Sequence, residues 1–271
     1  QNTAGAPAYC PFHMFKIIIL PRSQNLRPFQ TAYQIIDRHS FSQFLGLIRS
    51  STIPDEKTIW RFREQITQLK LERELFDLFN AKLELEGLLV SEGKIVDASF
   101  VEVPKQRNSK EDNKHIKEND CAPDSWSSNP HKLRQKDVDA RWTKKRNENH
   151  FGYKNHIKID GDSKLIEEYT SSSAEHHDSK ATELLIGDDA DHECEFYADS
   201  AYTGERCEKI IEASKMKNKV NEKGARNKPL TQEQKENNKE KSKTRARVEH
   251  VFGFMENSMG KLHMKCIGFE R

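Results

Sequence analysis

The sequence predicts a mixed α/β protein, in which helices cover a mixed β-sheet and a small helical segment precedes the sheet. Two short apolar runs rich in β-forming residues, at 94–101 and 195–202, indicate strands. Between and after them lie a hairpin pattern and further helical patterns. We therefore predict a helical domain at 1–90, followed by a domain built on a sheet at 91–271.

Several short helices are expected between residue 11 and about residue 90. Residues 29–37 and 40–47 carry clustered apolar side chains, and Ser40 is placed to cap the second cluster. Short helices with basic side chains fit a helix-turn-helix-like reader of DNA, and they fit an ordinary helical bundle equally well.

A further helix is expected to start within residues 53–64, where acidic residues occupy the first turn. Ile59 and Phe62 share one face of it. A longer helix then carries an apolar stripe that stops at Gly87. The members of this stripe are Leu71, Leu75, Leu78, Phe79 and Leu85.

A polar stretch from about residue 102 to residue 150 is long for a loop, and we interpret it as an insertion of uncertain order. Four of its residues could touch a substrate, although a solvated surface explains them as well. These residues are Asp137, Asp139, Arg141 and Trp142.

Residues 152–170 form the clearest hairpin pattern, because two strand-like runs flank Asp160-Gly161. Asp160 and Asp162 are therefore predicted to form the turn rather than to bind metal.

The helix that follows is expected to be capped by Asp178 or Ser179 and to end near Gly187, with a histidine ligand pair at 176–177 as the alternative. Another helix is expected over residues 205–213.

Charge is unevenly distributed along the chain, although the net charge is only +2. Residues 214–247 contain twelve Lys or Arg against four Glu. Such a basic segment suits a polyanion held beside acidic groups, and it also fits a solvated charged loop.

The five cysteines are scattered without a CxxC pair, which favours a reducing compartment and argues against a structural zinc site. The apolar run 14–20 is too short to span a membrane.

Three acidic residues stand in apolar surroundings. Asp97 and Asp199 each interrupt one of the two predicted strands, and Glu249 lies in a helical pattern beside Val248 and Phe252. A carboxylate in an apolar strand is costly unless a partner or a metal compensates it. Asp97 could simply cap a turn or meet a lysine. Alternatively, all three acids could converge on a pair of divalent cations.

With these residues in place, the sequence resembles a DDE transposase of bacterial insertion sequences, of the IS-five type. The resemblance runs from about residue 12 to the end. Its motifs are Ile-Val-Asp-Ala-Ser-Phe-Val at 95–101, Tyr-Ala-Asp-Ser-Ala-Tyr at 197–202, Arg-Ala-Arg-Val-Glu-His-Val-Phe-Gly-Phe at 245–254, Phe-Gly-Tyr-Lys-Asn-His at 151–156, Pro-Asp-Glu-Lys-Thr-Ile-Trp at 54–60 and Leu-Arg-Gln-Lys-Asp at 133–137.

This resemblance implies a ribonuclease-H-like catalytic domain. It also implies that Asp97, Asp199 and Glu249 bind two Mg²⁺ ions, which Mn²⁺ can replace, with Asp97 bridging both. The expected reaction is DNA strand cleavage at the ends of the element, followed by strand transfer into target DNA. The helical N-terminal part would help to recognise those ends.

The chain departs from the tyrosine-arginine-glutamate-lysine signature that such families carry. Arg245 and Glu249 are at the expected spacing, but Ser242 occupies the tyrosine place and Glu256 the lysine place. Lys261 or Lys265 could substitute for that lysine. Relatives usually continue beyond residue 271, so a truncated or decayed copy is also expected.

The expected partner is double-stranded DNA, bound by a homodimer in the cytoplasm near the nucleoid and away from membranes. Arg245 could orient Glu249, grip a phosphate, or form an ordinary i,i+4 ion pair. Further DNA contacts are expected from Lys154, Arg226, Lys228, Lys243 and Arg247. Two alternatives stay open: a DNA-binding protein derived from a transposase and lacking catalysis, and a metal-dependent nuclease of the same fold without a transfer step.

Overall fold

The computed structural model describes residues 8–47, 52–89, 93–145, 147–186, 193–226, 228–260, 263–264 and 267–269. The chain divides into two compact units, one formed by residues 1–78 with 254–261 and the other by residues 79–253 with 262–271. The break between residues 78 and 79 falls within the helix Glu72–Leu85, and the break between residues 253 and 254 falls within the helix Arg247–Asn257.

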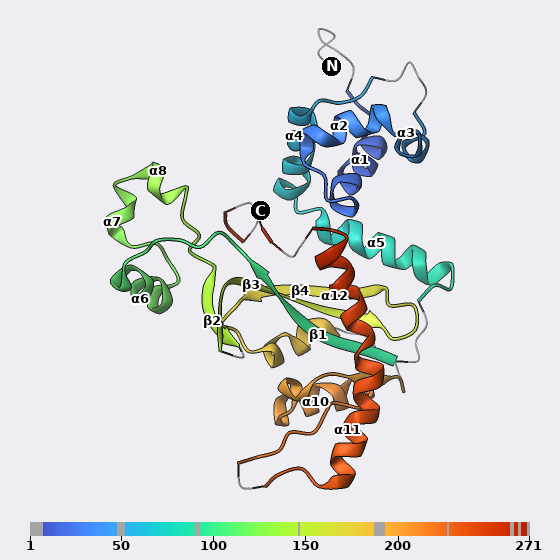
Figure 1. The fold of residues 1–271 in the computed structure, drawn as a ribbon, viewed down its shortest axis with the longest axis vertical. Coiled ribbons are helices and arrows are strands. Elements are labelled where there is room, and N and C mark those ends of the chain that lie inside the picture. The colour runs from blue at the N-terminus through green and yellow to red at the C-terminus, as the bar shows by residue number, and fades with distance from the viewer. Residues whose placement is uncertain are drawn as a thin grey trace. The chain divides into compact units, whose positions relative to one another are not determined.

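Helices form the first unit, as the sequence predicts (Figure 1). They are α1 (Pro11–Ser23), α2 (Pro28–Asp37), α3 (His39–Leu45), α4 (Glu56–Gln68) and the start of α5 (Glu72–Leu85). Their apolar faces meet in one core, because helical spacing places these side chains on a single stripe of each helix. The core consists of Met14, Ile17, Leu20, Ile35, Phe41, Leu45 and Ile59.

Local sequence signals set most helix ends in this unit. Asp55 caps α4 by accepting a hydrogen bond from the Thr58 backbone N–H at 2.8 Å. Gly87, just beyond α5, adopts the left-handed backbone (φ +67°) that ends a helix. The prediction that Ser40 caps a helix is wrong. Arg38 has the extended backbone of the N-cap, so Ser40 lies in the first turn of α3.

The apolar stripe of α5 does not form a buried face in the way the pattern suggests. The helix itself is confirmed, but Leu78, Phe79 and Leu85 are exposed, and Asn80 is the buried residue among the described positions of α5. Asn80 donates a hydrogen bond to the backbone oxygen of Glu167 at 2.9 Å. The apolar stripe therefore does not predict which residues of α5 are buried. The helix contacts the sheet through the polar side chain of Asn80 instead.

A mixed sheet forms the centre of the second unit, in the order β2-β3-β1-β5-β6, with β4 also paired to β3. Strand β1 pairs antiparallel with β3 and parallel with β5, so the sheet is mixed, as predicted. The strands are β1 (Gly93–Glu102), β2 (Arg141–Lys145), β3 (Glu148–Asp160), β4 (Ile166–Ser173), β5 (Glu195–Tyr197) and β6 (Lys217–Asn218).

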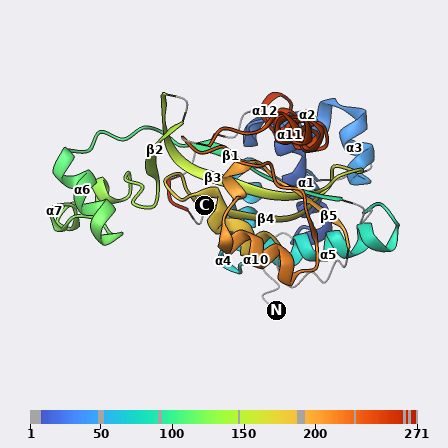
Figure 2. The ribbon, with the colours of Figure 1, turned by 90° about the horizontal axis from the view of Figure 1, so that it is seen from below.

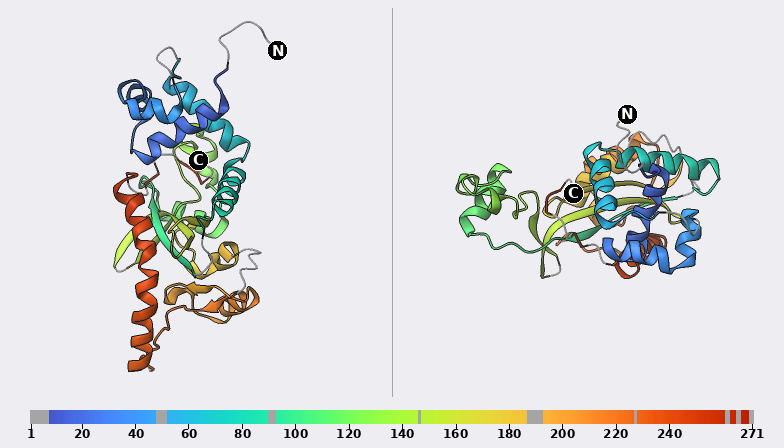
Figure 3. Two further views of the ribbon diagram at one scale, coloured as in Figure 1. Left: turned by 90° about the vertical axis from the view of Figure 1, so that its right-hand side faces the viewer. Right: turned by 90° about the horizontal axis from the view of Figure 1, so that it is seen from above.

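Helices cover both faces of this sheet (Figure 2). On one face, α9 (Thr182–Ile186) and α10 (Glu205–Ala213) pack against Val96 and Phe196. Neighbouring residues of a strand point to opposite faces, so Asp97 faces the other side. There it meets α11 (Gln232–Arg245), which α12 (Arg247–Asn257) continues with a break at Ala246 (Figure 3).

The hairpin predicted at 152–170 is confirmed as β3 and β4. Asp160 is fully buried and organises the turn, because one of its carboxylate oxygens accepts from the backbone N–H groups of Asp162 and Ser163. Gly152, with φ +147°, lies where an added Cβ would collide with the Val101 carbonyl oxygen, so glycine is required there.

The cap predicted at Asp178 or Ser179 is wrong. The His177 side chain caps the turn instead, accepting from the Ser179 backbone N–H at 3.3 Å. Asp178 is turned toward Lys154. The predicted helix end near Gly187 lies outside the described residues.

The polar stretch at 102–150 is more regular than the sequence suggests. It contains α6 (Lys110–Asn119), α7 (Asp124–Ser127), α8 (Pro130–Leu133) and β2. Trp126 is fully buried within it. Asp137 and Arg141 are buried and hydrogen-bonded, so they shape the insertion, whereas Asp139 and Trp142 are exposed. One buried indole with polar contacts around it gives the insertion a small core of its own.

No described helix is long and apolar enough to cross a bilayer. The described cysteines Cys10, Cys121, Cys194 and Cys207 are free thiols.

Buried His156 makes the stability of the fold depend on pH. Burial lowers the pKa of His156 from 6.5 to about 4. Between these values the unfolded chain binds a proton that the folded chain does not, so stability falls as pH falls through that window. We expect a loss of about 3 kcal/mol from pH 7 to pH 4, which His156→Gln removes. Urea unfolding across this range measures it. The exposed His131→Gln serves as control, and equal pH slopes in both variants would contradict the prediction.

Candidate active site

The parallel pairing of β1 and β5 brings the first two acids to one level of the sheet. Ile95 lies opposite Tyr197 in this register. Asp97 and Asp199 each follow two residues later, so both lie beyond the paired ends, side by side along the two strands. Asp199 follows the carboxyl end of β5, and Asp97 lies in the part of β1 that continues past this end.

Asp97 is partly buried and held from two sides. One carboxylate oxygen accepts a hydrogen bond from the Ala98 backbone N–H at 2.8 Å, and the other accepts from Arg245 Nη1 at 2.8 Å. Burial raises the pKa of Asp97, against the opposing effects of the Ala98 N–H and the Arg245 charge. The carboxylate of Asp199 raises this pKa further, as expected for acids that follow the same register position on adjacent strands.

Asp199 also has a local structural role. Its carboxylate accepts from the Ala201 backbone N–H at 2.8 Å and so caps the short 3₁₀ turn Ser200–Tyr202. This is the turn-capping role that an acid at the end of a strand commonly has. Capping uses one carboxylate oxygen of Asp199 and so fixes the direction of the side chain. The other oxygen can still accept a second contact.

Glu249 reaches the site from α12, one helical turn after Arg245. Arg245 Nη2 lies 3.7 Å from Glu249 Oε1, while Nη1 of the same guanidinium binds Asp97. The i,i+4 ion pair is thus present, and Arg245 also connects the helix to the sheet. One cationic group therefore lies between the first and third acids. Glu249 is mostly exposed, with 66% of its side chain accessible, whereas Asp97 is 19% accessible.

Carboxylates are the donors that hard divalent cations prefer, so the acids fit such an ion in donor type. Across the described part of the chain, however, no three acidic, histidine or cysteine side chains are arranged to hold one metal ion. The positive charge among these acids is the guanidinium of Arg245. A divalent cation shared by Asp97 and Glu249 would therefore take over a role that Arg245 fills in this structure.

A buried tyrosine lies next to the acids, and the sequence analysis did not single it out. Tyr202 is 1% exposed, and its hydroxyl has no hydrogen-bond partner among the described residues. Burial raises the pKa of Tyr202 well above 10, and the nearby carboxylates of Asp178, Asp97 and Asp199 add to the shift. From sequence alone, Tyr202 could have been found by its position three residues after Asp199. Asp178 in turn pairs with Lys154 at 2.8 Å.

The residues predicted to contact DNA occupy different environments. Lys154 is mostly buried and donates to the backbone oxygen of His176 at 2.6 Å. Arg247 donates to Asp162 at 2.8 Å and so anchors α12 to the hairpin turn. Lys243, Arg226 and Lys228 are exposed. DNA contact by each of them stays a prediction.

The two departures from the signature are also located. Ser242 accepts a hydrogen bond from the Asn221 side chain at 3.1 Å, and Glu256 is exposed on α12. The suggested substitutes Lys261 and Lys265 lie outside the described residues.

Comparison with known families identifies two matching regions. Residues 90–271 match the family described as transposase DDE domain, and residues 2–65 match the family described as transposase domain (DUF772). No solved structure matches the chain. The first match covers the mixed sheet, its flanking helices and all three acids, and it agrees with the ribonuclease-H-like fold expected from the sequence.

The bond between Arg245 and Asp97 should contribute measurably to stability. We expect Arg245→Leu to destabilise the fold by about 2 kcal/mol, because it leaves a partly buried carboxylate without its charged donor. In a double-mutant cycle, adding Asp97→Asn should cost less than it does alone, since no charge then remains uncompensated. Urea unfolding measures both effects. Lys243→Ala, which removes an exposed ion pair of the same helix, should change little, and fully additive effects at 97 and 245 would refute the coupling.

Proposed function

Because the chain belongs to the family of transposase DDE domains, we propose that it cleaves DNA strands at the ends of an insertion sequence and joins them to target DNA. We propose further that the element is of the IS-five type. The reaction would cut a phosphodiester by hydrolysis and then use the freed 3′-hydroxyl to attack a second phosphodiester, so that one phosphodiester bond replaces another.

The observation that supports this proposal best is that acids distant in the sequence are linked in the fold, in part through one arginine. Asp97 and Asp199 interact electrostatically, and Arg245 contacts both Asp97 and Glu249. Electrostatic repulsion makes such a cluster unfavourable without positive charge. Carboxylates that stay close together in a fold despite their repulsion are typical of sites that bind a cation or a reacting phosphate.

We assign Asp97, Asp199 and Glu249 as the ligands of divalent cations, with Mg²⁺ as the natural ion and Mn²⁺ as a substitute. Bound cations would supply an activated water and would neutralise charge on the reacting phosphate. If Asp97 held such a cation, the guanidinium of Arg245 would no longer be needed to compensate its charge. Arg245 could then bind a phosphate oxygen pair bidentately, and its i,i+4 contact would orient Glu249.

The proposed partner is duplex DNA, held by a homodimer that brings two ends together near the nucleoid. The helical part that matches the second transposase family would recognise the ends. Exposed positive charges at Arg226, Lys228 and Lys243 would bind phosphates in a salt-dependent way, and Arg245, Arg247 and Lys154 would add further contacts.

One observation favours a second candidate, a DNA-binding protein without catalysis. The three acids do not surround a common point among the described residues, and Arg245 fills the place of a cation. This candidate differs from the transposase in that it cuts no DNA, so the carboxylates of the cluster do not matter for it. A nuclease cuts DNA but does not join it. Pre-cleaved ends incubated with a target plasmid separate the nuclease from the transposase, because a nuclease leaves them unjoined.

Asp97→Asn should abolish cleavage and joining while leaving DNA binding intact. The amide keeps the shape but removes the charge that holds a cation, so we expect rates to fall by roughly 10³-fold or more. Cleavage of end-containing DNA in Mg²⁺ measures the rate, and a band-shift assay measures binding. The control Asp139→Asn changes an exposed acid and should act as the parent does. Parent-like cleavage by Asp97→Asn would exclude this site.

Mg²⁺ should stabilise the parent chain through these acids, independently of any reaction. At a concentration of 100 times the dissociation constant, binding adds about 2.7 kcal/mol to stability, or roughly 5–10 °C in melting temperature. Asp97→Asn/Asp199→Asn should lose this shift, whereas Glu256→Gln should keep it, because Glu256 is exposed and outside the cluster. An equal shift in the double variant would place the ion elsewhere.

A further inference from the structure

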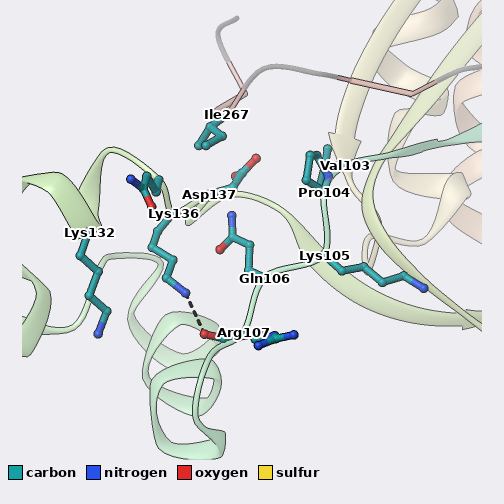
Figure 4. Close-up of a pocket in the computed structure, with 10 residues that line it drawn as sticks. Val103, Pro104, Lys105, Gln106, Arg107, Lys132, Lys136, Asp137 and Ile267 are labelled. Carbon is teal, nitrogen blue, oxygen red and sulfur yellow. Dashed lines mark hydrogen bonds between the residues drawn. The ribbon is translucent and has the colours of Figure 1, made fainter.

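A second cluster of positive side chains lies away from the three acids, where the chain leaves β1 and enters the insertion. Residues 103–107, Lys132 and residues 135–137, with Ile267, enclose a pocket of about 210 Å³ (Figure 4). Four of its lining residues are basic: Lys105, Arg107, Lys132 and Lys136. From sequence, this stretch was expected to be an insertion of uncertain order, and none of these four residues belongs to the DNA-contacting set proposed above.

The positive charge of this pocket is not neutralised by ion pairs. Within the described residues, none of its four basic side chains pairs with a carboxylate. Asp137 lines the pocket, but its Oδ1 accepts from the Ala140 backbone N–H at 2.9 Å and from the Tyr153 hydroxyl at 2.7 Å. Asp112 acts on Lys136 from the start of α6, where it accepts from the Ser109 backbone N–H at 3.4 Å. Hydrogen bonds hold both carboxylates in place, and against these two acids the pocket has four basic side chains, an excess of two positive groups.

Two of the ammonium groups are held in place before any ligand arrives. Lys136 Nζ donates to the Arg107 backbone oxygen at 2.8 Å and to Asn108 Oδ1 at 2.6 Å. An ammonium has three donors, so one stays available. The ammonium groups of Lys132 and Lys136 lie 5.1 and 5.2 Å from the centre of the buried Trp126 ring. Burial and the neighbouring Lys132 lower the pKa of Lys136, against the opposing effect of Asp112.

The size and composition of the pocket define its ligand. Pockets for drug-sized molecules span roughly 300–1,000 Å³ and are lined mostly by apolar groups. This pocket is smaller and carries four cations, so it suits a compact anion with several oxygen acceptors, as a phosphate group has. Arg107 adds a planar guanidinium, which can bind two phosphate oxygens at once.

We propose that this pocket binds one backbone phosphate of a DNA duplex, at a site distinct from the acidic cluster. The inference rests on the proposed function, because DNA is the polyanion that a transposase holds. Lys105 follows Asp97 by eight residues, which limits their separation to about 29 Å. On a duplex with a rise of 3.4 Å per base pair, the bound phosphate would lie up to about eight base pairs from the reacting one. The pocket would thus set the position of the duplex along β1.

The test compares two triple variants of the full chain for binding to a labelled DNA duplex over a range of salt concentrations. Lys105→Gln/Arg107→Gln/Lys132→Gln removes pocket charges and leaves the structural Lys136 in place. Lys110→Gln/Lys114→Gln/Arg134→Gln removes the same charge from the insertion outside the pocket. For the pocket variant we expect about tenfold weaker binding and a salt slope about 0.9 smaller, the value for one phosphate. The control variant should keep the parent slope.

A parent-like slope and affinity in the pocket variant would overturn this site while leaving the proposed function untouched. A parent chain that binds no duplex would instead overturn the proposed function, and the phosphate site with it. DNA binding that is kept in Asp97→Asn and weakened in the pocket variant would support the assignment of Asp97 to catalysis and of the pocket to phosphate binding. If the triple variant unfolds, as judged by its melting temperature, Lys105→Glu carries the same expectation at one exposed position, and Lys105→Arg should bind as the parent does.

Discussion

The contact between Asp97 and Arg245 connects the two halves of the site. A carboxylate in the middle of a largely buried strand is unfavourable unless an opposite charge or hydrogen-bond donors compensate it. The guanidinium supplies both at 2.8 Å, and it comes from a residue 148 positions further along the chain. The end of α11 is therefore fixed over the acidic face of β1. The position of Glu249, one turn later, follows from that placement, because helix geometry puts Glu249 on the same face as Arg245.

The strand register has a comparable effect on the other side of the site. Pairing Ile95 with Tyr197 aligns Asp97 with Asp199, and a shift by one residue would turn one of the two acids to the opposite face of the sheet. The opposite face carries Val96 and Phe196, whose burial against α9 and α10 prevents such a shift. The apolar core thus fixes the geometry of the charged site without touching a substrate.

The same strand connects the acidic cluster to the basic pocket of the insertion. β1 carries Asp97 in its middle and continues into residues 103–107, which form one wall of that pocket. A negative site on a strand and a positive site on the segment that directly follows it suit a polyanion that must be positioned and also cut.

Much of this protein was predictable from local sequence patterns. Acidic residues in its first turn predicted the start of α4, and Asp160-Gly161 predicted the hairpin turn. Short apolar runs of β-forming residues predicted β1 and β5, although β5 ends at Tyr197, before Asp199. These features depend on neighbours within a few residues, so the sequence alone determined them. The mixed sheet with flanking helices followed from the order of such elements.

Tertiary structure decided what depends on contacts between distant residues. That Arg245 binds Asp97 as well as Glu249, that Lys154 is paired with Asp178, and that lysines 132 and 136 meet residues 105–107 could not be read from spacing. A side chain's charge is fixed by its identity, but its partner is fixed by packing. The sequence therefore determined which chemical groups this protein possesses, and only the fold decided which of them compensate one another and which remain available to a ligand, since that depends on distances that local patterns do not encode.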